Sequence, residues 1–337
     1  MTDKTPSSWI ARLPLAGLSM TQEKIVFALA VALFAVFSFT LKDFASIDNL
    51  MGLLYNVSVL GVLGLAMALV VIGRGIDLSL IATMAISVAW SLTLIRTGTS
   101  IEMALLYGGL MALAIGVING WLIAYAEIPA LFCTLAMGTL VYGFGRIALI
   151  PADVVYMPAD AGWFGALGQA EVLGIPAPVI VFLLFALLAT GVLKYTRFGR
   201  YTYLMGDNYA AARITGVPTR PMLVMQYAIT SLIGFVAGLV TAASVDSMNT
   251  RIVNSTMIYD VILVVVLGGI GLSGGKGGVR NVIVGTLLIG ILLNGMTIMN
   301  IEYTVQNFIK GAILLAALIF DSFINPRDEQ TAQQGDI

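Results

Sequence analysis

The sequence has no histidine and only one cysteine, Cys133, among its 337 residues. Histidine is the commonest general base and metal ligand, and a lone cysteine cannot form a disulfide within its own chain. Charged residues are also scarce, at 10% of the total, and the formal net charge is −1. We therefore expect no metal site, no cofactor, no nucleic-acid surface and no catalytic serine that depends on a histidine base.

Hydrophobic residues, in contrast, make up 59% of the chain, and the mean hydropathy is +0.98. Such a composition does not fit a soluble domain. Lipid leaves only helices or closed barrels to satisfy the backbone, and each helix needs about 20 apolar residues. We predict an all-α polytopic membrane protein with about ten transmembrane helices, at residues 25–40, 50–72, 78–95, 103–124, 131–148, 177–193, 222–243, 257–272, 279–299 and 303–323.

This prediction divides the chain into a polar segment at residues 1–24, a membrane domain at 25–323 and a tail at 324–337. The first apolar run lacks a small-residue cleavage site, so we expect a retained span and not a removed signal peptide. Two connections are longer than the others: a polar insertion at 194–221 and a loop at 149–176.

The distribution of basic residues predicts the orientation, because Lys and Arg concentrate in cytoplasmic loops. With the N-terminus inside, the outer side holds Lys42, Arg96, Arg146 and Arg251, and Lys310 lies within the last span. Both termini and the polar insertion are then cytoplasmic, and the loop at 149–176 faces outward. The cytoplasmic side holds the other basic residues, which are Lys4, Arg12, Lys24, Arg74, Lys194, Arg197, Arg200, Arg213, Arg220, Lys276, Arg280 and Arg327.

The polar insertion contains the signals of a short helix. Asp207 or Asn208 can cap its start, residues 209–215 would form it, Gly216 suits a left-handed position after it, and Pro218 prevents its continuation. Two interpretations are open. The insertion is either a solvated basic loop or a docking helix for a soluble partner.

One internal repeat links the ends of two apolar segments, residues 71–79 (VIGRGIDLS) and 266–273 (VLGGIGLS). Internal duplication is common in transporters. The second copy also matches the patterns of a dinucleotide site and a serine hydrolase, but it follows a membrane helix and the chain has no histidine. A phosphate loop is excluded by Ile270 and Gly277, which replace residues it needs. If the protein uses ATP, another chain must bind it.

Five stretches of the chain form a recognisable series: residues 73–79 (GRGIDLS), 116–128 (GVINGWLIAYAEI), 196–216 (TRFGRYTYLMGDNYAAARITG), 260–279 (DVILVVVLGGIGLSGGKGGV), and Asn294-Gly295 with Lys310-Gly311. In this order they resemble the permease subunit of bacterial ABC importers for monosaccharides of the ribose type. The resemblance implies a multi-pass protein of the bacterial inner membrane, in contact with membrane lipid, with no ATPase site of its own. Its partners would be an ABC ATPase subunit, a periplasmic substrate-binding protein and a second copy of the chain.

The resemblance also implies that the short helix sits in a groove of the ATPase. There it would couple ATP hydrolysis to the import of a monosaccharide or a related polyol. Arg200 and Arg213 would serve as polar anchors. The full set of implied coupling residues is Arg200, Tyr209, Ala210, Ala211, Arg213 and Gly216.

The chain departs from the family pattern at four positions. Asp207 replaces a Gly, Tyr209 stands where Glu is common, Ile258 replaces an acidic residue, and Arg74 replaces a Gly. These departures leave the substrate open between a pentose, a polyol and a modified sugar.

Polar groups within spans usually face a cavity or a partner. The candidates for the translocation path are Asp77, Ser79, Asn119, Asp260 and Asn294. Simpler interpretations also exist. Asp77 can cap the third span, and Asn119 and Asn294, each followed by Gly, can form hydrogen bonds across close helix crossings.

Asp260 and Lys310 are opposite charges at similar predicted depths in the eighth and tenth spans. A lone charge in the bilayer costs about 2.5 to 3.5 kcal/mol, which favours an ion pair. In the alternative, Lys310 extends its side chain to the membrane surface.

Other functions remain as alternatives. A stand-alone secondary transporter would need a relay of ionisable groups, for which only Asp260 and Lys310 are candidates. An ABC permease for a non-sugar solute, such as a nucleoside, is a second alternative. A membrane-embedded enzyme would need a catalytic constellation, which the sequence does not offer.

Overall fold

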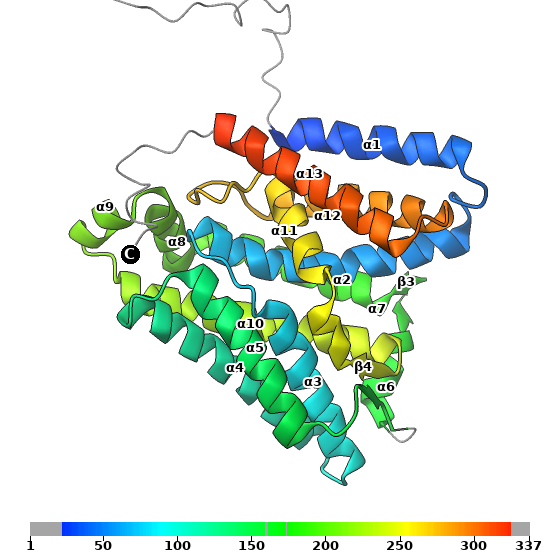
Figure 1. Ribbon diagram of the computed structural model, residues 1–337, viewed down its shortest axis with the longest axis horizontal. Coiled ribbons are helices and arrows are strands. Elements are labelled where there is room, and N and C mark those ends of the chain that lie inside the picture. The colour runs from blue at the N-terminus through cyan, green and yellow to red at the C-terminus, as the bar shows by residue number, and fades with distance from the viewer. Residues whose placement is uncertain (1–21, 159–160, 173, 325–337) are drawn as a thin grey trace, which may run out of the picture.

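The computed structural model describes residues 22–158, 161–172 and 174–324 (Figure 1). Helices dominate it. In chain order they are α1 (Gln22–Thr40), α2 (Ile47–Ile72), α3 (Leu80–Arg96), α4 (Ile101–Tyr125), α5 (Ala130–Phe144) with the π-helical turn η2 (Gly145–Leu149), α6 (Gly162–Gln169), α7 (Ala177–Tyr195), α8 (Arg197–Asp207), α9 (Tyr209–Ile214), α10 (Thr219–Ser244), the 3₁₀ turn η3 (Thr250–Asn254), α11 (Met257–Leu267), α12 (Val279–Ile298) and α13 (Tyr303–Ile324).

Each predicted span lies on one of these helices, and most ends agree within a few residues. Within the described residues, seven helices are long and apolar enough to cross a membrane: α1, α2, α4, α5 together with η2, α7, α10 and α12. The other three predicted spans correspond to shorter apolar helices, α3, α11 and part of α13. The prediction was wrong at the end of α11, which stops at Leu267 and not at residue 272. The Gly-rich stretch from Gly268 does not continue the helix, because each glycine loses more conformational entropy in a helix than other residues do.

Helix α2 occupies the centre of the molecule. Of its most apolar window, 89% is buried, because α7, α10, α11 and α12 all pack around it. Helix α3 is buried over residues 80–89 and packs against α4 and α10. A helix that is apolar on every side belongs in the interior, whereas one that is apolar and exposed, such as α1, belongs at the lipid boundary.

Helices α4 and α10 cross at two glycines. A Cβ atom at Gly116 would lie 2.5 Å from the backbone oxygen of Tyr227, and one at Gly120 would lie 2.5 Å from the Cα of Val224. Small residues four positions apart let two membrane helices approach closely. The crossing carries the neighbouring Asn119 side chain into the interior, where it is fully buried.

The polar insertion holds two helices where one was predicted. Helix α8 follows α7 almost directly and was missed. Helix α9 is the predicted short helix and ends at Ile214. Its N-cap is Asn208, whose Oδ1 accepts a hydrogen bond from the Ala211 N–H at 2.9 Å, and Gly216 follows it with φ of +85°.

Short strands and turns fill the connections at the other end of the molecule, where α6 also lies (Figure 1). Strand β1 (Val154–Tyr156) pairs antiparallel with β4 (Ser247–Asn249), and β2 (Glu171–Val172) pairs with β3 (Ile175–Pro176). Nearly all of the predicted N-terminal segment and C-terminal tail lies outside the described residues.

Candidate coupling surface and buried polar groups

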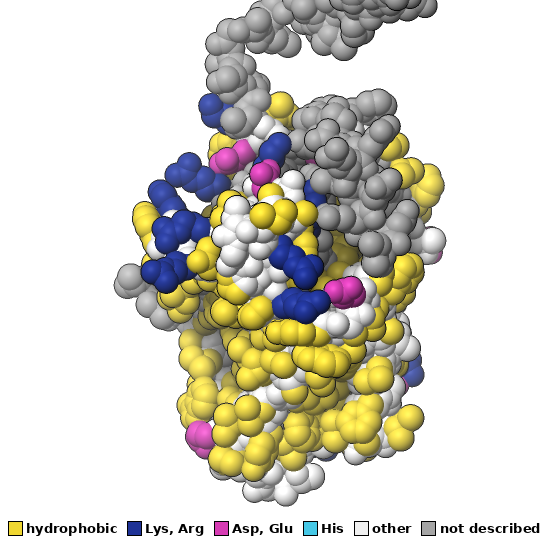
Figure 2. All heavy atoms as spheres, turned by 90° about the vertical axis from the view of Figure 1, so that its left-hand side faces the viewer, with side chains coloured by type: hydrophobic (Ala, Val, Ile, Leu, Met, Phe, Trp, Pro, Cys, Tyr) yellow, Lys and Arg dark blue, Asp and Glu magenta, His cyan; other side chains and the backbone are white. Residues whose placement is uncertain are grey.

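Helix α9 projects from the end of the molecule opposite α6 (Figure 1). Ala212 of this helix is buried in a small apolar cluster with Met205 of α8 and Met222 of α10, and Tyr209 packs against the same cluster. The implied coupling residues Arg200, Ala210, Ala211, Arg213 and Gly216 are all exposed, and Tyr209 is half-buried. Figure 2 shows that Lys and Arg side chains gather on this end, with few acidic side chains among them.

Ile214 gives this surface an apolar centre. It is 86% exposed at the end of α9, between the exposed Arg213 and Gly216. Sequence reasoning missed it, although an Ile in an otherwise polar insertion is a readable signal. A lone exposed apolar side chain is common, but one on a short helix beside an exposed arginine, on an end of the molecule rich in Lys and Arg, suits a protein partner.

Helix α8 connects this exposed helix to the core. Gln226 of α10 donates a hydrogen bond from Nε2 to Thr202 Oγ1 at 3.0 Å, and both residues are fully buried. The Tyr203 hydroxyl donates to the Gly277 carbonyl, just before α12, at 2.8 Å. Burial raises the pKa of Tyr203, so its phenol remains a donor. The backbone of Gly206 packs directly on Ile72 and Gly275, where a Cβ would not fit.

The two repeat segments meet beneath α8. The Gly275 N–H donates to the Ile72 carbonyl at 2.9 Å, and Arg74 Nε donates to the Ser273 carbonyl at 2.8 Å. Each segment also ends its helix in the same way, with a residue of positive φ, Arg74 at 73° and Gly269 at 96°. Helix α8 therefore rests on the end of α2 and on the loop between α11 and α12.

The sequence contained a signal for α8 that we did not use. Phe198, Thr202, Met205 and Gly206 recur at helical spacing and form its inner face. Thr196 precedes it as an N-cap, accepting a hydrogen bond from the Gly199 N–H at 3.2 Å.

Three of the path candidates form one buried network. Asp77 Oδ1 accepts hydrogen bonds from the Ser79 N–H at 3.0 Å and the Ser79 hydroxyl at 2.6 Å, and Asn119 Nδ2 donates to Ser79 Oγ at 2.8 Å. All three residues are fully buried. Asp77 thus orders the turn before α3 through Ser79 and does not bond the amides inside that helix. Asn119 joins α4 to the same turn.

Asn294 on α12 lies at a different crossing. It exchanges two amide hydrogen bonds with Asn49 at the start of α2, at 2.9 and 3.0 Å. The next residue, Gly295, lies against the Phe37 ring of α1, where a Cβ would not fit. Asn294 therefore joins helices in the manner that its position before a glycine suggests.

Asp260 and Lys310 are brought together between α11 and α13. Lys310 Nζ lies 2.8 Å from Asp260 Oδ1 and donates to Asp260 Oδ2 at 3.1 Å and to Thr256 Oγ1 at 3.0 Å. The Lys310 side chain is 5% exposed. It does not extend to the surface.

Comparison with known proteins identifies the family of this chain. Residues 49–318 match the family described as the permease component of the branched-chain amino acid transport system. This chain belongs to that permease family. It is 30% identical over 304 residues to the ribose import permease of Escherichia coli K12, covering 90% of this chain and 94% of the relative. It is 31% identical over 273 residues to the ribose import permease of Bacillus subtilis 168, covering 81% and 84%.

A third relative carries a different sugar in its name. The L-arabinose transport system permease of Escherichia coli K12 is 31% identical over 301 residues, covering 89% of each chain. No solved structure matches the chain. Arg74 has φ of 73°, a backbone conformation that glycine adopts most easily. Here the arginine keeps that backbone and adds the bond to Ser273.

Proposed function

We propose that this permease is the membrane-spanning subunit of an ABC importer that brings a monosaccharide or a related polyol into the cytoplasm. The observation that carries the proposal is the similarity to ribose and arabinose permeases, which covers 90% and 89% of this chain. ATP would be hydrolysed by a separate ATPase subunit.

In the proposed orientation, the end with α8 and α9 is cytoplasmic. The excess of Lys and Arg on that end supports this assignment (Figure 2). Both termini would then be cytoplasmic, and α6 with the short strands would face the periplasm. We count α3, α11 and α13 as the remaining three of ten spans. Helix α11 has only 11 residues, or about 16 Å of rise. Its irregular continuation is tolerable at membrane depth because protein covers it.

The coupling proposal assigns α9 to a groove of the ATPase. Ile214 would be the apolar anchor, and Arg200 and Arg213 would pair with acidic groups at the rim. Movement of α9 would pass to α8 and from there to α2, α10 and α12, since α8 contacts or hydrogen-bonds all three regions. This route gives the ATPase a direct mechanical connection to the buried centre of the permease.

The other partners follow the same orientation. A second copy of the chain would complete the translocation path, and a binding protein would dock at the end with α6. At that end Asp153 is held between Arg146 at 2.7 Å and Arg251 at 2.5 Å, which fixes the loop before β1 to η3. A fixed outer surface suits the docking of a rigid partner.

Within each permease, we assign Asp77, Ser79 and Asn119 to helix positioning. Asp77 Oδ1, the Ser79 hydroxyl and Asn119 Nδ2 bond one another across the turn before α3 and the buried face of α4, which suits a positioning role. The second carboxylate oxygen of Asp77, Oδ2, is buried without a hydrogen-bond partner among the described residues. Asp260 is likewise engaged with Lys310. A stand-alone secondary transporter would need a relay of ionisable groups through several spans, and a single ion pair between α11 and α13 does not supply one.

Uptake of labelled solutes by cells with and without the gene tests the substrate class. Ribose, arabinose, a polyol, a nucleoside and leucine should be compared. We expect gene-dependent uptake of a sugar or polyol. Uptake of leucine alone would follow the family description and contradict the proposal, and uptake of the nucleoside alone would support the non-sugar alternative.

A further inference from the structure

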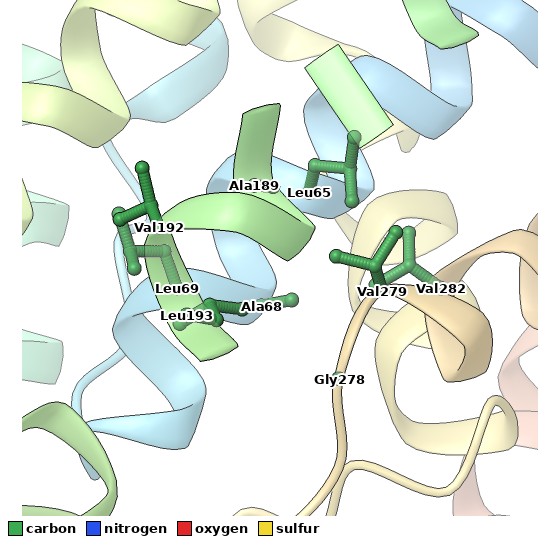
Figure 3. A pocket seen from close by; sticks show the side chains of 9 residues that line it. All are labelled: Leu65, Ala68, Leu69, Ala189, Val192, Leu193, Gly278, Val279 and Val282. Atoms are coloured by element: carbon green, nitrogen blue, oxygen red, sulfur yellow. The ribbon is translucent and has the colours of Figure 1, made fainter. Parts of the chain in front are cut away.

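A cleft of about 580 Å³ opens between α7 and α12 on the flank of the molecule. The two helices contact each other little, while both pack on α2. A smaller pocket of about 30 Å³ adjoins the cleft and shares Leu193, Gly278 and Val279 with it. Figure 3 shows this smaller pocket, where Leu65, Ala68 and Leu69 of α2 lie between Val192 of α7 and Val282 of α12. All of its side chains are apolar. The larger cleft is a preformed space in a surface that would face lipid.

The cleft changes character toward the end where α8 lies. Its apolar walls include Leu183, Leu187 and Ile283, and its far end is lined by Lys194, Arg280, Tyr203, Asn281 and Glu23. Lys194 and Arg280 are exposed, and neither has an ion-pair partner within the described part of the chain. Two cations face one carboxylate, so this end of the cleft is basic.

We propose that this cleft binds an anionic phospholipid of the cytoplasmic leaflet, with one acyl chain between α7 and α12 and the phosphate beside Lys194 and Arg280. Basic pockets between membrane helices on the cytoplasmic side are suited to such headgroups. The inference rests on the orientation proposed above, which puts Lys194 at the inner interface. Tyr195, 73% exposed beside it, is of the type that marks a membrane interface.

Length decides between a lipid chain and a partner helix as the occupant. Along α7 the cleft runs from Leu183 to Lys194, about 16 Å at a rise of 1.5 Å per residue. That is about half of a 30 Å hydrocarbon core. A transmembrane helix of a partner would need a groove of twice this length, whereas one acyl chain of one leaflet fits.

The backbone at the basic end adds a second attraction for phosphate. Helix α12 starts there after Gly278, and no side chain caps its first amides. The N-terminus of a 20-residue helix favours an anion. The Tyr203 bond to Gly277 holds this start in place.

Native mass spectrometry of the full-length permease in mild detergent tests the headgroup. We expect phosphatidylglycerol to bind in preference to phosphatidylcholine of the same chain length, by about fivefold for each cation. The double variant Lys194→Ala with Arg280→Ala should lose the preference. Arg197→Ala with Arg213→Ala removes the same charge outside the cleft and should retain it. An unchanged preference in the first variant would overturn the proposal. Displacement of the lipid by inorganic phosphate would also overturn it, in favour of a free-anion site.

A photo-crosslinker on Leu187→Cys identifies the occupant directly, and the same probe on Leu184→Cys, exposed on α7 outside the cleft, is the control. We expect lipid adducts at position 187 that are enriched in anionic headgroups relative to those at position 184. Adducts to a second copy, or to the chain's own N-terminal segment, would assign the cleft to that occupant and refute the lipid site. Neither experiment involves the ATPase, so failure here leaves the proposed transport function standing, and failure of transport leaves this site standing.

Discussion

Lys310 Nζ of α13 lies 2.8 Å from Asp260 Oδ1 of α11, and the two side chains are 5% and 13% exposed. Lys310 also donates to Thr256 Oγ1, which bonds Tyr303 and Asn307 of α13. The pair is therefore the centre of a polar cluster that joins two neighbouring helices at one end. Removing one partner of such a buried ion pair destabilises a protein strongly, whereas the intact pair contributes little net stability.

A double-mutant cycle measures that dependence. Asp260→Asn and Lys310→Met should each destabilise the detergent-solubilised permease by about 3 kcal/mol, because each leaves one charge buried and unpaired. The double variant should recover part of the loss. Thermal unfolding provides the measurement, and strictly additive losses would contradict the coupling.

Thr256→Val separates the ion pair from the rest of the cluster. It removes the hydrogen bonds that Thr256 Oγ1 makes with Lys310, Tyr303 and Asn307, and it leaves the carboxylate in place. The expected loss is about 2 kcal/mol in the same thermal assay, because several partly exposed hydrogen bonds are lost together. A loss as large as that of Asp260→Asn would place the stabilisation in the hydroxyl and not in the ion pair.

Gly216→Val tests the end of α9. The glycine has φ of +85°, and an added Cβ would meet no atom within 4 Å, so any effect comes from the backbone conformation. A β-branched residue there costs about 1 to 2 kcal/mol. Substrate-stimulated ATP hydrolysis by the reconstituted complex should fall, while Gly216→Asn, which tolerates positive φ, should retain most of it.

Gly98 supplies the matched control for this variant. It has φ of +96°, its Cβ would also meet no atom within 4 Å, and it lies after α3, away from α9. Gly98→Val carries the same strain and should leave coupling intact. Equal loss of ATP hydrolysis in both variants would point to general instability.

Ile214→Asp tests the apolar anchor. The side chain is 86% exposed, so the substitution should not lower the thermal stability of the isolated permease. In the complex it should weaken ATPase association by about 2 kcal/mol or more, the cost of truncating a central interface residue. Co-purification at graded concentrations measures this, and undiminished association would show that the ATPase docks elsewhere.

Substitutions at Arg74 should follow a fixed order of stability, with the native arginine first, glycine second and alanine last. Arg74→Ala should be less stable than the native permease by about 2 kcal/mol, since it loses a charged hydrogen bond to Ser273 and keeps the positive φ. Arg74→Gly should recover about 1 kcal/mol of that loss, because glycine relieves the strain. Thermal unfolding that ranks Gly below Ala would contradict this assignment.

Apolar run length was sufficient to place the helices of the membrane domain, and side-chain caps were sufficient to place α9. Both signals are local. The turn after Ile72 was harder to predict from the sequence, because its geometry depends on the contact between Ile72 and Gly275, which lie more than 200 positions apart. The early end of α11 had a local signal, the glycines from Gly268 onward, which we did not use. Helix α8 was obscured by its basic residues, which made an amphipathic helix resemble a loop.

Some contacts of the buried polar side chains could be predicted from the sequence, and others could not. The pairing of Asp260 with Lys310 could be inferred from cost alone, since two buried opposite charges have few other solutions. The network of Asp77, Ser79 and Asn119 could not, because neutral groups have many partners and the packing of α4 on α10 selects one. The cleft between α7 and α12 is a property of packing and leaves no trace in either segment.

ATP-driven uptake into proteoliposomes is the most direct test of the proposed function. The permease would be reconstituted with its ATPase and binding protein, and accumulation of a labelled monosaccharide or polyol would be followed with ATP supplied on the side of α8 and α9. We predict uptake that requires ATP, the binding protein and an intact α9, and that stops when the ATPase is catalytically inactive. Uptake of the same solute by the permease alone, driven by an ion gradient, would contradict the assignment as an ABC importer subunit.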